Sequence, residues 1–87
     1  MDKKELEVQL ATEAAVLVQR RTDFDAARAE YLRASKRDCH RSEGSGAQDA
    51  RHEALLETFR NDERMAEAAL NNQQRVVAEL AEKFAKN

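Results

Sequence analysis

The residue types best suited to metal binding or nucleophilic chemistry gather near the middle of the chain. They are Cys39, His40 and His52. Cys39 and His40 are sequence neighbours, so their side chains point about 100° apart if the segment is helical. They also lack the paired ligand spacing of a structural zinc site. We therefore interpret these residues as solvated side chains near helix ends, and we expect no metal site.

Two short segments have part of the pattern of a ligand-binding loop. Asp23 and Asp25 are spaced like calcium ligands, but the loop glycine and the later bidentate glutamate are missing. Residues 44–46, Gly-Ser-Gly, are not followed by the lysine of a phosphate-binding loop, and no strand precedes them. We interpret the first segment as two exposed carboxylates flanking a buried ring. We predict that the chain is not an enzyme, has no catalytic residues and binds no cofactor.

Basic residues are concentrated between residues 20 and 41. The formal net charge of the whole chain is −2, which argues against a general nucleic-acid binder. Asp38 interrupts the basic run, and ion pairs with acidic residues of another helix, together with helix dipoles, account for the pattern without a ligand. An acidic protein partner and nucleic acid are the two alternatives. The candidate binding residues of this end are Arg33, Arg37 and Arg41.

The composition indicates long helices with one break. The chain has 87 residues and no proline, and its two glycines are Gly44 and Gly46. Charged residues make up 37% and aromatic residues 5%, which disfavours a compact core with an aromatic centre. A chain of this length forms one small domain, residues 1–87, with a thin margin of stability.

The second half of the chain contains an unbroken alternation of three-residue and four-residue steps. Apolar residues at a mean spacing of 3.5 form a seam on one side of a helix, which another helix must cover. Seven of the nine seam positions are apolar, and glutamate and glutamine fill the other two. The seam is Leu56, Phe59, Glu63, Ala66, Leu70, Gln73, Val77, Leu80 and Phe84.

The first half supplies a matching helix. Asp2, three residues before Glu5, has the pattern of a capping box, so we expect this helix to begin at about residue 3. Its seam repeats every seven residues at Leu10, Leu17, Phe24 and Tyr31, with intermediate positions Leu6, Glu13, Arg20, Ala27 and Ala34. We predict an all-α, coiled-coil-like hairpin with helices at about 3–41 and 47–86 and a turn at about 42–46.

A short connection makes the two helices antiparallel neighbours. Seam residues whose numbers sum to about 90 should then face each other, as Tyr31 and Phe59 do. This register brings Leu17 near Gln73. A lone polar residue on a seam usually costs stability and specifies register or partner.

Apolar residues away from the seam widen the apolar stripe on both predicted helices. The stripe is typical of a bundle helix rather than of an isolated pair. We therefore expect a further surface to be covered, either by a second copy in a four-helix bundle or by a different protein. The candidate partner-binding residues are Val18, Leu32, Leu55, Met65 and Val76.

These features favour a non-enzymatic protein–protein interaction module, a small adaptor, chaperone or inhibitor that presents a helical face. Small helical hairpins with such roles include phage-borne and bacterial proteins. The alternative is a dimeric nucleic-acid-binding regulator that uses the Arg-rich end. The single cysteine fits a reducing compartment, and no apolar run approaches the ~20 residues that span a bilayer. We expect a cytoplasmic protein with no membrane contact.

Overall fold

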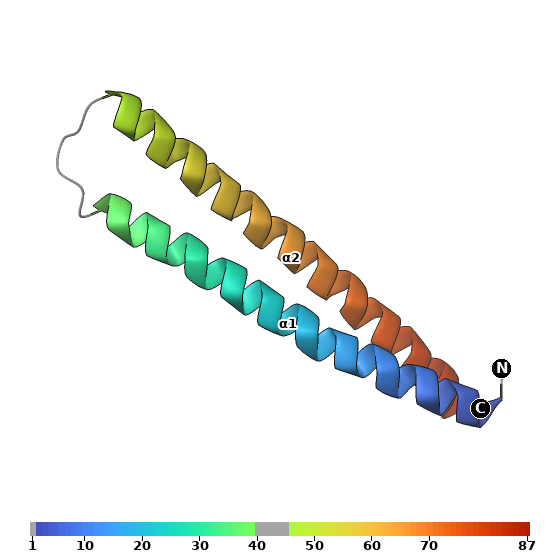
Figure 1. Ribbon diagram of the computed structural model, residues 1–87. Coiled ribbons are helices and arrows are strands. Elements are labelled where there is room, and N and C mark those ends of the chain that lie inside the picture. Colours follow the sequence, from blue (N-terminus) through green and yellow to red (C-terminus); the bar gives the residue numbers. More distant parts are fainter. Residues whose placement is uncertain (1, 40–45) are drawn as a thin grey trace.

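The computed structural model consists of two long helices lying side by side (Figure 1). It describes residues 2–39 and 46–87, and for residues 37–39 and 46–49 it describes the backbone alone. Helix α1 spans Lys3–Cys39 and helix α2 spans Gly46–Lys86. The described residues contain no strand. The protein is an all-helical, two-helix hairpin.

The helix ends follow local signals in the sequence. Asp2 caps α1, because its Oδ1 accepts a hydrogen bond of 2.8 Å from the backbone N–H of Glu5. This confirms the expected N-cap. Helix α1 was expected to extend to residue 41, but residues 40 and 41 and most of the expected turn lie outside the described residues. Helix α2 begins at Gly46, one residue before the expected start.

The expected seams are covered in the structure. All nine seam positions of α2 are buried or partly covered, and so are the seam positions of α1 except Arg20. Arg20 keeps its guanidinium in solvent, where it lies 3.8 Å from a carboxylate oxygen of Asp23. The most buried side chains form the core between the helices, and they are Leu6, Ala34, Leu70 and Leu80.

Cross-helix contacts define the register of the hairpin. Lys3 lies over the ring of Phe84, with 5.1 Å from its Nζ to the ring centroid. Gln73 contacts Glu13 by hydrogen bonds, and Arg60 contacts Tyr31. The residue numbers of these pairs sum to between 86 and 91, close to the expected value of about 90. Early residues of α1 therefore meet late residues of α2.

The hairpin is a thin rod of 63 × 15 × 14 Å. Its accessible surface is 6536 Å², whereas a globular monomer of its mass, 9.9 kDa, exposes about 5,200 Å². Neither helix contains, in its described residues, an apolar stretch long enough to cross a membrane. The rod shape leaves each helix with one covered side and a broad outer surface.

Candidate protein-interaction surfaces

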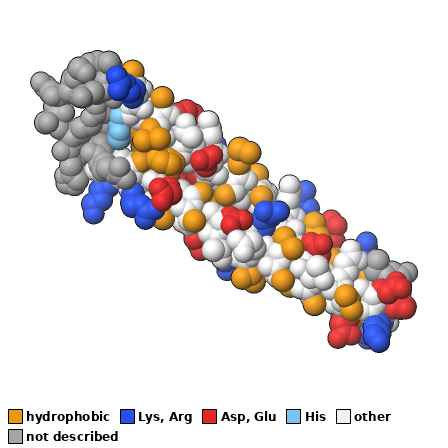
Figure 2. Space-filling view, in the orientation of Figure 1, with side chains coloured by type: hydrophobic (Ala, Val, Ile, Leu, Met, Phe, Trp, Pro, Cys, Tyr) orange, Lys and Arg blue, Asp and Glu red, His pale blue; other side chains and the backbone are white. Residues whose placement is uncertain are grey.

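Large apolar side chains are exposed on both helices of the hairpin. The five apolar residues expected to bind a partner are all among them, and Val8 joins the set. Hydrophobic side chains lie between charged ones over the visible face of the rod (Figure 2). The exposed residues are Val8, Val18, Leu32, Leu55, Met65 and Val76.

On α1 the exposed apolar residues face away from α2. Each residue turns a helix by about 100°, so Val18 lies about 120° around the helix from buried Leu6. Leu32 and Val8 are two residues from buried Ala34 and Leu6, which places each about 160° from the core-facing direction. Their side chains are 52–68% exposed. These residues therefore belong to an outer face and do not border the core.

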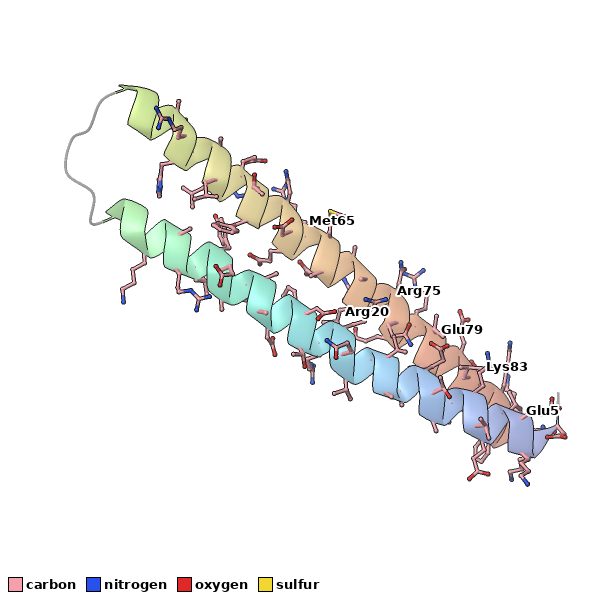
Figure 3. The ribbon with its side chains drawn as sticks, in the orientation of Figure 1. Glu5, Arg20, Met65, Arg75, Glu79 and Lys83 are labelled. Carbon is pink, nitrogen blue, oxygen red and sulfur yellow. The ribbon has the colours of Figure 1, made fainter. Side chains whose placement is uncertain are left out.

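On α2 the exposed residues divide into two kinds. The first kind borders the core and is only moderately exposed, at 38% for Val76 and 45% for Leu55. Met65 is 71% exposed and points away from α1 (Figure 3). The outer surface of α2 is thus less continuously apolar than that of α1.

The exposed residues of the two helices do not form one patch. Val18 and Leu32 each follow a seam residue directly, whereas Leu55, Met65 and Val76 each precede one. The cross-helix contacts join early residues of α1 to late residues of α2. In that arrangement, positions that follow the seam lie on one side of the hairpin and positions that precede it lie on the other. A partner that contacts the exposed apolar residues of α1 therefore leaves those of α2 exposed.

Of the three basic candidates, Arg33 and Arg37 lie in the last turns of α1. Arg33 is exposed and forms an ion pair with Glu30, one turn earlier on the same helix. The side chain of Arg37 is not described, and Arg41 lies outside the described residues. This ion pair lies within α1, whereas the sequence predicted ion pairs with acidic residues of another helix. The nucleic-acid alternative stays a prediction.

A polar contact in the core seam was not expected from the sequence. Gln73 is partly buried, and its Nε2 donates hydrogen bonds of 2.8 Å to the backbone oxygen of Glu13 and 2.6 Å to Oε2 of the same residue. The register predicted from the sequence instead brings Gln73 near Leu17. A signal was present, since Glu13 is the neighbouring polar seam position. Pairing the two polar residues satisfies groups that would otherwise lose solvation.

A second unexpected contact joins the two helices between Tyr31 of α1 and Arg60 of α2. Nη2 of Arg60 donates a 3.0 Å hydrogen bond to the hydroxyl of Tyr31, and its Cζ lies 5.5 Å from the ring centroid. The hydrogen bond from Arg60 lowers the pKa of Tyr31, and one from Ser35 adds to the effect. The same contact raises the pKa of Arg60. Arg60 also lies 3.7 Å from Glu57.

The residues considered as ligands show no assembled site in the described part. Asp23 and Asp25 are exposed as expected, but the ring of Phe24 between them is partly covered and not buried. Asp23 accepts a 2.8 Å hydrogen bond from Gln19. Among the described residues, no three His, Cys, Asp or Glu side chains lie together in a way that could hold a metal ion. The side chain of Cys39 is not described, and His40 lies outside the described residues.

Comparison with known proteins gives no match to a family model, a curated protein or a solved structure.

Proposed function

We propose that this chain is a non-enzymatic protein–protein interaction module, in which an antiparallel hairpin presents its outer helical faces to a partner protein. The role is that of a small adaptor, chaperone or inhibitor acting in the cytoplasm. The partner is a different protein, a second copy of this chain in a four-helix assembly, or both. The observation that carries the proposal is that, among the described residues, six large apolar side chains are exposed, whereas the buried core consists of three leucines and one alanine.

The physical reason is the imbalance between core and surface. The chain exposes about 1,300 Å² more than a globular monomer of its mass. Binding removes part of that surface from water, at a gain of about 25 cal/mol per Å² of apolar area before the costs of association. Helix faces with apolar residues at steps of three and four are a common way for proteins to recognise helical partners.

The test compares charge substitutions on the outer faces of α1 and α2. Leu32→Glu and Met65→Glu each replace an exposed apolar group, so both variants should keep the helicity of the hairpin in circular dichroism. Asn71→Glu adds the same charge at an exposed polar position and is the control. The immobilised variants and wild type are compared for the proteins that they retain from the source cell, including free copies of the chain.

We expect at least one protein to be retained by wild type and by Asn71→Glu but reduced about tenfold or more by one of the apolar variants. A tenfold loss corresponds to about 1.4 kcal/mol, less than the burial of one leucine contributes. Equal retention of every bound protein by all four chains would show that the outer apolar residues are not a binding surface.

A further inference from the structure

We draw no further inference here: the strongest candidate, the exposed apolar patch on the outer face of α1 around Val8, Val18 and Leu32, is a surface for which nothing in the structure shows what covers it.

Discussion

Glu13 and Gln73 show how a single polar contact fixes the alignment of two otherwise repetitive helices. The amide of Gln73 reaches both the backbone oxygen and the carboxylate of Glu13 across the seam. A shift of either helix by one seven-residue repeat would replace Glu13 by Leu6 or Arg20, and neither side chain accepts a hydrogen bond. The contact therefore favours the observed register over its neighbours.

A double-mutant cycle on this pair measures that contribution. We expect Glu13→Ala and Gln73→Ala to show a coupling free energy of about 1 kcal/mol in urea unfolding, because the hydrogen bond to a carboxylate is only partly shielded from solvent. The control cycle pairs Glu13→Ala with Gln74→Ala, which changes an exposed neighbour. Equal coupling in the two cycles would contradict a specific role for Gln73.

Tyr31 offers a spectroscopic probe of the cross-helix contact with Arg60. The chain has one tyrosine and no tryptophan, so the ultraviolet absorbance of tyrosinate reports Tyr31 alone. Arg60→Gln removes the main interaction that favours the phenolate, so the pKa of Tyr31 should rise towards its ordinary value. Arg33→Gln, which changes an exposed arginine on α1, should leave the titration unchanged.

The same contact predicts the direction of a pH effect on stability. The pKa of Tyr31 is lower in the folded chain, so the unfolded chain binds more protons between the folded and unfolded pKa values. Stability from this group is present above the unfolded pKa and is lost as the pH falls through the folded pKa. The effect belongs to alkaline pH, and Arg60→Gln should remove most of it.

Each helix has a covered seam and an outer face, and these two regions contribute differently to the stability of the hairpin. Leu70 lies in the seam and is buried, whereas Met65 lies on the outer face of the same helix. Burial of an apolar side chain stabilises the hairpin, but an exposed one gains little on folding.

Truncating Leu70 and Met65 to alanine distinguishes a side chain that stabilises the fold from one that lies on the exposed surface. Leu70→Ala should lower the free energy of unfolding by about 2–3 kcal/mol, because it removes transfer energy and leaves a cavity. Met65→Ala should change it by less than about 0.5 kcal/mol. Both values come from urea unfolding followed by circular dichroism at one protein concentration. A comparable loss in the two variants would mean that the outer face of α2 is covered in solution.

The whole molecule is unusually extended for its length. Its radius of gyration is 19.4 Å, compared with about 12 Å for a compact domain of 87 residues. A rod of this kind can associate side by side or end to end, and the two modes give different shapes.

Small-angle X-ray scattering distinguishes these modes. Two hairpins that associate through their outer helical faces overlap along most of their length, because each is a rod 63 Å long. We expect a dimer with twice the mass of the hairpin but a longest dimension close to 63 Å. Val18→Glu should keep that length at half the mass. A longest dimension near twice that of the hairpin would indicate end-to-end association and contradict self-association through the outer helical faces.

Much of the hairpin was predictable because its signals are local. The three-and-four alternation from Leu56 to Phe84 specifies which side of a helix is apolar, and burial follows that pattern at every position of the seam. The cap at Asp2 depends on residues three apart, and the structure confirms it. Val18 and Met65 lie off the seam, and both are exposed.

The sequence by itself determined that two helices form, which side of each is covered and which apolar residues stay outside, because helix geometry relates all of these to spacing along one chain. Only the tertiary structure decided that Gln73 meets Glu13 rather than Leu17, and that Arg60 lies against Tyr31. It also decided that Val18 and Met65 lie on different sides of the hairpin. These outcomes depend on the direction and register of one helix relative to the other, and a shift of a few ångströms there changes every cross-helix neighbour while leaving each helix's own pattern intact.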